Sequence, residues 1–274
     1  MQRYLTKIKH LVKKIYLFLI LTMAVCVGCQ LQVRPPEEEG RPQELVIDRF
    51  DRIESLYLTM GDYAALSQMR TDYPVQTRTL IEDVLQLGAV NDVDINNRFL
   101  IYFQDSTLQA LIAEVAQQYE NMDDINRQLN DAFRKLQKLF PQIVIPHVYT
   151  QVGSLDQSIV VGDSILGISL DKYLGADHPI YVRYGYTEGQ RRTMTREFIV
   201  PDCLCFYLLS QYPLSEDQLA DSMLRHWHIA KIQCLVNQVL DRRFFNDELI
   251  DNLEQFRLQH RQMTAEDFLS LDSI

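Results

Sequence analysis

Apolar residues recur at helical spacing through most of the first half of the chain. Two segments carry a single apolar stripe each, and such stripes are typical of helices with one buried face. Asp105 or Ser106 is the expected N-cap of the first, and Pro141 ends the second. The stripes are Leu108, Leu111, Ile112, Val115 and Tyr119, then Ile125, Leu129, Phe133, Leu136 and Phe140.

Two weaker helical patterns precede these stripes. Residues 45–73 predict a helix that Pro74 stops, and residues 76–87 predict another that Gly88 ends. The first of these helices is expected to bury one face formed by Ile53, Leu56, Tyr57 and Met60.

The pattern changes to β-structure between residues 143 and 170. The segments "IVIPHVYTQV" and "SIVVGDSILGISL" are rich in β-branched residues. Gly162 and Asp163 form a predicted two-residue turn with glycine first, so residues 159–161 and 164–170 predict a hairpin. A third strand is expected near residues 143–150.

Helical patterns return in the last third. The segment "FIVPDCLCFYLLSQYP" predicts a helix opened by Pro201 and closed before Pro213. Ser215 and Gln218 form a capping box ahead of one long helix, and a last helix is expected near residues 247–260, before a polar end. The buried face of the long helix is predicted to include Leu219, Met223, Ala230 and Cys234.

The order of helices, short sheet and helices predicts an α+β fold. The fold is mostly helical, and residues 45–274 are expected to form a single domain.

The first 28 residues have the features of a secretory signal peptide. Five basic residues precede an apolar run of 13 residues, 15–27, which is too short for a membrane-spanning helix of about 20 residues. The run leads into "CVGC", which resembles the lipobox of bacterial lipoproteins. Cys29 is therefore the predicted lipid attachment site; an ordinary signal peptide with a cysteine near the cleavage site is the alternative. Residues 30–44, rich in proline and glutamate, predict a flexible tether.

Removal of the signal peptide makes the chain strongly acidic. The cleaved chain keeps 22 of the 27 Lys and Arg residues against 37 Asp and Glu, so the net charge falls from −10 to −15. Nucleic acids and anionic membrane surfaces are disfavoured partners of such a chain, because their phosphates are repelled.

Three cysteines, Cys203, Cys205 and Cys234, remain besides Cys29. Each lies in an apolar, helix-like stretch, so buried thiols are predicted. A disulfide between Cys234 and one of the other two is the alternative.

No metal or nucleophile motif is present in the sequence. No histidine has a partner four residues on, so the two-ligand helix of zinc peptidases is missing. His226 and His228 are two residues apart and point about 200° apart on a helix; His226 is predicted to be in the core and His228 on the opposite side. The sequence also lacks Gly-x-Ser-x-Gly and a glycine-rich phosphate loop. We expect no metal and no cofactor.

The segment "LDKYLGADHPIY" after the hairpin resembles the signature of the GldB-type gliding-motility lipoproteins. The resemblance implies a domain similar to zinc peptidases (zincin-like) but without the metal motif. It also implies a lipoprotein on the periplasmic side of the cytoplasmic membrane, rather than the outer membrane, of Bacteroidetes-type bacteria, with protein partners in gliding or associated secretion machinery. The matching positions are Leu170, Asp171, Tyr173, Leu174, Gly175, Asp177 and Tyr181.

Two classes of function follow. The first is a lipid-anchored, non-enzymatic protein that acts by contact with envelope partners. The second is a divergent hydrolase of peptide or cell-wall material, with Asp171, Asp177 and His178 as acid–base residues. For the first class the segment has an architectural role: Asp171 caps the following turn, Gly175 supplies a positive φ, and Pro179 keeps His178 extended.

Overall fold

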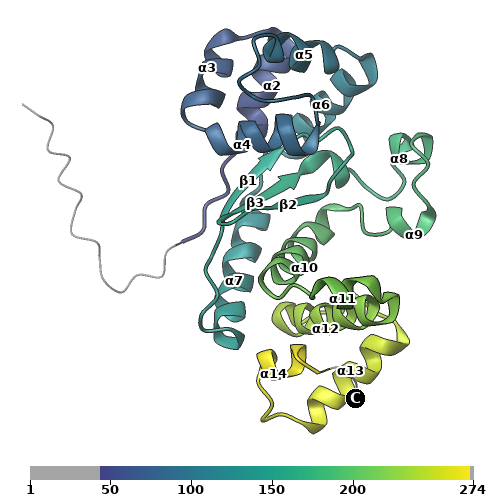
Figure 1. Cartoon of the computed structure of the whole chain (residues 1–274). Helices are drawn as coiled ribbons and strands as arrows, with labels where there is room; N and C mark the ends of the chain where they lie inside the picture. Colours follow the sequence, from purple (N-terminus) through teal and green to yellow (C-terminus); the bar gives the residue numbers. More distant parts are fainter. Residues whose placement is uncertain (1–43, 272–274) are drawn as a thin grey trace, which may run out of the picture. The chain divides into compact units, whose positions relative to one another are not determined.

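The computed structural model describes residues 44–271 and contains a three-stranded mixed sheet. The strands β1 (His147–Gln151), β2 (Ile159–Val161) and β3 (Ile165–Ser169) lie in the order β1-β3-β2 (Figure 1). β2 and β3 pair antiparallel, which confirms the predicted hairpin, and β1 pairs parallel to β3 as the expected third strand.

The hairpin loop differs from the predicted turn. β2 ends at Val161 and β3 begins at Ile165, so the loop has three residues, 162–164, rather than two. Gly162 does not have the positive φ that a glycine-first two-residue turn requires. The loop is closed by a hydrogen bond from the Gly162 N–H to the Ile165 carbonyl, 3.0 Å long.

Helices surround the sheet, and two of them pack directly on its strands. α2 packs against β1, and α10 packs against β2 and β3. The elements before the sheet are α2 (Phe50–Met60), α3 (Tyr63–Thr71), α4 (Pro74–Arg78), the π-helix η1 (Thr79–Val84), α5 (Ile95–Tyr102), α6 (Ser106–Gln118) and α7 (Asp123–Leu139).

The predicted helix over residues 45–73 is two helices. Gly61 ends α2 with a φ of +65°, and the Asp62 carboxylate then caps α3 by accepting two backbone N–H groups. The predicted buried face was also partly wrong, because Leu56 and Met60 are 41% and 74% exposed, whereas Tyr57 is buried.

Both strong stripes are confirmed: all ten apolar residues predicted for α6 and α7 are buried. Asp105 is the N-cap of α6 and accepts the N–H groups of Thr107 and Leu108. The short helix α5 was not predicted, although its Ile95 and Phe99 are fully buried.

The elements after the sheet are short at first and then long. They are the 3₁₀ turn η2 (Leu170–Lys172), α8 (Pro179–Arg183), α9 (Glu188–Arg191), the 3₁₀ turn η3 (Arg196–Phe198), α10 (Ile199–Gln211), α11 (Glu216–Ala220), α12 (Ser222–Leu240), α13 (Glu248–Gln259) and α14 (Ala265–Leu269). The predictions for the capping box at Ser215 and for α13 are confirmed. The predicted helix α10 is also present, but it begins at Ile199, two residues before the predicted opening at Pro201.

The long helix predicted after Ser215 is interrupted. Asp221 is extended and its carboxylate caps a new helix, α12, so the short α11 does not share a face with α12. Leu219 of α11 and Met223, at the start of α12, are 49% and 78% exposed, while Ala230 and Cys234 are buried as predicted.

The two histidines of α12 have the opposite placement to the predicted one. His228 is buried and its Nε2 donates to the Tyr212 carbonyl at 2.8 Å, whereas His226 is exposed. The prediction of a polar end after the last helix was also wrong, because a further helix, α14, follows and its Phe268 is fully buried.

The three cysteines of the described part are free and buried, as predicted. Within residues 44–271, none of the helices combines the length and the apolar character that a membrane crossing requires.

Candidate functional site

Asp171 lies in the core directly after β3, with no exposed surface. Its Oδ1 accepts the Gly153 N–H at 2.8 Å, and its Oδ2 accepts the Leu155 N–H at 2.5 Å. The predicted N-cap role was therefore wrong, since the carboxylate binds a turn 16 to 18 residues earlier in the chain instead of the residues that follow it. Burial raises the pKa of Asp171, while the two backbone hydrogen bonds act in the opposite direction.

The turn that Asp171 binds has an unusual backbone. Ser154 and Leu155 both have positive φ, +54° and +65°. Two consecutive left-handed residues turn the N–H groups of Gly153 and Leu155 toward one point, and the carboxylate occupies that point. Non-glycine residues adopt this conformation at an energetic cost. The two hydrogen bonds to the Asp171 carboxylate stabilise the turn in this conformation.

Tyr173 joins two helices through its two polar ends. Its carbonyl accepts the phenol hydroxyl of Tyr119, at the end of α6, at 2.5 Å. Its own hydroxyl donates to Oδ2 of Asp202 in α10 at 2.9 Å. Burial raises the pKa of Asp202 to about 7, and the hydrogen bond from Tyr173 opposes that rise.

Tyr181 closes the segment on itself. Its hydroxyl donates to the Asp171 carbonyl at 2.7 Å and accepts the Leu174 N–H at 2.8 Å. Gly175 has a φ of +123°, as predicted, and its N–H donates to the Met194 carbonyl. Leu170 and Leu174 are buried. The six signature residues other than Asp177 thus fix the conformation of the chain between β3 and α8.

Sequence reasoning missed Lys172 as a part of this cluster. Its ammonium group is buried, donates to the Tyr186 hydroxyl at 2.8 Å and to the Leu155 carbonyl at 3.2 Å, and lies 4.3 Å from the centre of the Tyr186 ring. The 3₁₀ turn buries three consecutive residues. The helical or strand periodicity of apolar residues therefore does not indicate that Lys172 is buried.

The structure places the three candidate acid–base residues in three different environments. Asp171 is enclosed by backbone groups, and Asp177 is exposed. His178 is half-buried, and its Nε2 is 2.6 Å from Oε2 of Glu114. Its Nδ1 accepts the Ile180 N–H as the N-cap of α8, so the ring hydrogen is on Nε2.

Residues 44–271 contain no group of three or more His, Cys, Asp or Glu side chains placed to hold a metal ion. Cys29, the predicted lipidation site, lies outside the described residues.

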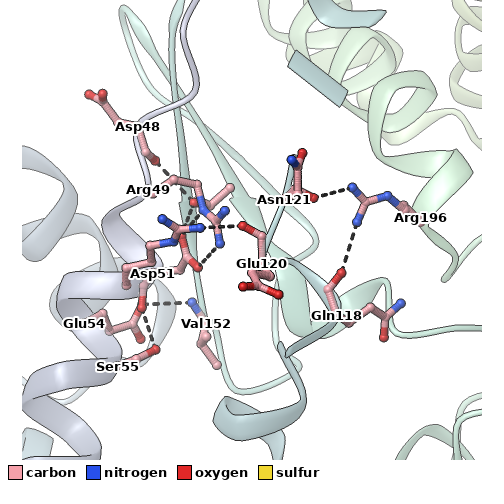
Figure 2. A network of polar contacts seen from close by, with 12 residues as sticks. Asp48, Arg49, Asp51, Glu54, Ser55, Gln118, Glu120, Asn121, Val152 and Arg196 are labelled. Atoms are coloured by element: carbon pink, nitrogen blue, oxygen red, sulfur yellow. Dashed lines mark hydrogen bonds and ion pairs between the residues drawn. The ribbon is translucent and has the colours of Figure 1, made fainter. Parts of the chain in front are cut away.

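A second polar network, drawn in Figure 2, holds the residues between α6 and α7. Arg52 of α2 donates to the Glu120 carbonyl at 2.5 Å, and Arg196 donates to the Asn121 carbonyl at 2.8 Å and forms an ion pair with Asp124. These arginines bind backbone carbonyls between α6 and α7 that have no helical partner. They hold the residues next to Tyr119.

Glu54 of α2 is a further buried carboxyl group of this region, beside buried Asp51. Its Oε2 accepts the Val152 N–H at 2.9 Å (Figure 2), and its Oε1 has no hydrogen-bond partner within the described structure. Burial raises its pKa well above the usual range, with smaller contributions from Asp51 and Asp171. Its position four residues after Phe50 and three before Tyr57, on the buried face of α2, is the signal by which the sequence could have identified it.

Comparison with known proteins gives one family. The family model for the gliding motility protein GldB matches residues 33–255, which is well over half of the chain and includes the whole segment from Leu170 to Tyr181. No curated protein and no solved structure matches the chain.

Proposed function

The chain belongs to the gliding motility protein GldB family, and from this premise we propose that it is a lipid-anchored periplasmic protein that acts by contact with partner proteins of the cell envelope, without catalysis. The anchor is Cys29, and the cytoplasmic membrane is the membrane that we favour. The partners belong to gliding or associated secretion machinery.

One observation carries the non-enzymatic part of this proposal. The signature segment uses its polar groups for internal hydrogen bonds: Asp171 binds two backbone N–H groups, Tyr181 binds two backbone groups, and Tyr173 links α6 to α10. A catalytic acid or base must reach a substrate within hydrogen-bond distance, and a carboxylate enclosed in this way does not. The segment is therefore a scaffold.

The alternative, a divergent hydrolase of peptide or cell-wall material, would need Asp171, Asp177 and His178 to converge. Their separate environments argue against this reaction site. The expected likeness to zinc peptidases stays a prediction, because no solved structure matches the chain.

The experiment that tests the proposal uses the full-length lipoprotein in membranes of its own host. We expect envelope proteins to co-purify with the wild type and to be lost in Cys29→Ala, which is released from the membrane or keeps its signal peptide uncleaved. Hydrolysis of peptide or peptidoglycan by the purified protein, abolished in His178→Ala while the fold is retained, would instead establish the hydrolase.

A further inference from the structure

A cavity of about 580 Å³ lies between α12, α13 and the loop that joins them. Its volume is typical of sites for small organic molecules. Four arginines and two acidic residues line it, so the lining is positive although the chain as a whole is acidic. A cavity of this sign attracts anions. The charged lining residues are Arg242, Arg243, Arg257, Arg261, Asp241 and Glu254.

Two of the four arginines are neutralised by ion pairs within the protein. Arg242 pairs with Glu197 at 2.8 Å. Arg243 pairs with Glu254 at 3.5 Å and also with Asp251. Because their positive charge is already compensated, these two arginines contribute little attraction for a further anion.

The other two arginines, Arg257 and Arg261, form no ion pair within the part of the chain that the structure describes. The guanidinium of Arg257 donates to the side-chain oxygen of Gln238 at 3.1 Å and to two backbone carbonyls at 3.4 Å. Arg261 donates to the Leu258 carbonyl at 3.3 Å. Asp241, the remaining acidic residue of the lining, pairs instead with a lysine of α7 at 2.6 Å.

Arg257 is the more buried of these two arginines. It is half-buried, and its guanidinium carbon lies 4.9 Å from the centre of the Phe268 ring. Burial lowers the pKa of Arg257, because the charged form has lost part of its water. Buried charges in proteins are normally paired, and neutral oxygens replace the lost water only in part. An oxyanion in the cavity would supply the missing opposite charge.

One wall of the cavity is fixed by the buried side chain of Asn237. Its oxygen accepts the N–H groups of Phe244 and Phe245 at 2.9 and 3.1 Å. Its amide nitrogen donates to the Phe245 carbonyl at 2.7 Å and to Oε1 of Glu254 at 3.0 Å. The side chain thus ties the loop after α12 to α13. A ligand that enters a wall fixed in this way loses little affinity to the ordering of the protein.

We propose that this cavity binds a phosphomonoester, whose phosphate group is held by Arg257 and Arg261. At pH 7 the phosphate of a monoester carries a charge of about −1.5 to −2, which matches two guanidinium groups that lack a carboxylate partner in the described structure. Guanidinium groups bind phosphate through two parallel hydrogen bonds. Leu258, a lining residue that is 56% exposed, would contact the organic part of the ligand. Ligand binding at this site goes beyond the proposed function and does not depend on it.

The experiment titrates phenyl phosphate into the full-length lipoprotein in a non-ionic detergent and measures the heat of binding. We expect saturable binding of phenyl phosphate and weaker binding of phenylacetate, whose single charge leaves one arginine unpaired. Arg257→Gln and Arg261→Gln should each weaken the binding of phenyl phosphate on the order of tenfold, whereas Arg257→Lys, which keeps the charge, should weaken it less. The absence of saturable binding at millimolar phenyl phosphate, or equally tight binding of phenylacetate, would overturn the phosphate site.

Arg191→Gln is the matched control. Arg191 is also half-buried and donates to a backbone carbonyl, but it lies outside the cavity. This variant should bind phenyl phosphate like the wild type. A loss equal to that of Arg257→Gln would assign the effect to the general loss of positive charge and overturn the site.

The exposed Arg261 keeps the test independent of folding, because Arg257 also contacts Gln238 and Phe268 and its replacement lowers stability as well as affinity. Arg261→Gln should have the thermal unfolding midpoint of the wild type without ligand and still lose affinity. Unchanged affinity of Arg261→Gln for phenyl phosphate would overturn the site formed by two arginines.

Phosphomonoesters occur as soluble molecules and as the headgroup of phosphatidic acid. Competition against phenyl phosphate by glycerol phosphate and by a short-chain phosphatidic acid distinguishes these two sources. Both orders of affinity support the phosphate site: tighter glycerol phosphate assigns a soluble ligand, and tighter phosphatidic acid assigns a lipid headgroup. If neither competes, the phosphate group is not what the cavity recognises and the site is overturned. The proposed function is unaffected by any of these results, because its own test is the co-purification of envelope proteins.

Discussion

The phenol hydroxyl of Tyr181 lies 2.7 Å from the carbonyl oxygen of Asp171, ten residues earlier in the chain. The same hydroxyl accepts the Leu174 N–H, so one buried oxygen satisfies two backbone groups of the segment between them. Asp171 in turn uses its side chain to hold the turn at residues 153–155. The signature segment is thus attached to the protein at both ends, and its stability depends on a few buried polar atoms.

Replacing Asp171 tests this attachment directly. Asp171→Ala leaves two buried N–H groups without acceptors, and each such group costs roughly 1–3 kcal/mol. We therefore expect the free energy of unfolding to fall by about 3 kcal/mol, more than the loss of a helix cap would produce. Equilibrium urea unfolding measures the change.

The matched control for this variant is Asp177→Ala, because Asp177 belongs to the same segment and is exposed. Its effect should lie within about 0.5 kcal/mol of zero. Equal effects of the two substitutions would contradict the buried role of Asp171.

Gly175 offers a test of backbone conformation alone. Its φ of +123° strains any residue with a Cβ, yet an added Cβ would meet no atom within 4 Å. Gly175→Val should therefore destabilise the protein by about 1–3 kcal/mol through backbone strain. Gly189→Ala is the control, since Gly189 has an ordinary φ and an open environment. If neither substitution changed the thermal unfolding midpoint, the positive φ at position 175 would not require glycine.

His178 has a larger structural role than the sequence suggested. The sequence predicted only that Pro179 keeps it extended, whereas in the structure its Nδ1 caps α8 and its Nε2 contacts Glu114. We expect His178→Ala to cost about 1 kcal/mol, the usual value of a lost cap, and His178→Asn to cost less because asparagine can cap. Glu114→Ala separates the second contact from the first. Urea unfolding of the three variants checks this; identical stability of His178→Ala and the wild type would show that the cap contributes nothing.

The parts of the fold that the sequence predicted are those with local, one-sided burial. α6 and α7 each bury a single stripe, and a signal of period 3.6 identifies such a stripe without knowledge of the partner. The hairpin was likewise found from β-branched runs around a short turn. α12 was predicted less well, since α7, α10, α13 and α14 all contact it and its buried positions surround the helix instead of forming one face.

The role of Asp171 could not be predicted for a different reason. Its partners are backbone N–H groups of Gly153 and Leu155, and they point toward it only because Ser154 and Leu155 adopt positive φ. Serine and leucine give no sequence signal for that conformation. The positive φ of Gly175 was predictable because glycine is the residue that favours it.

The anchoring prediction concerns Cys29, outside the described residues. Cys29→Ala should release the protein from the membrane or leave its signal peptide uncleaved, because lipid chains supply membrane affinity that an acidic domain lacks. Membrane fractionation and the mass of the mature N-terminal peptide measure the two outcomes. Normal processing with unchanged membrane attachment would contradict lipidation at this position.

The pair formed by Asp202 and Tyr173 predicts a pH dependence of stability. Burial raises the pKa of Asp202 from 3.8 to about 7 in the folded protein, so the folded state binds this proton more tightly than the unfolded state does. The stabilisation is complete below the unfolded pKa and is lost as the pH rises through about 7. Urea midpoints of the wild type should therefore fall between pH 5 and pH 8 by more than those of Asp202→Asn, which keeps an acceptor for the Tyr173 hydroxyl but cannot ionise. Asp177→Asn should retain the wild-type profile, because that carboxylate is exposed. If the profiles of the wild type and Asp202→Asn are parallel over this range, Asp202 is not the group that titrates.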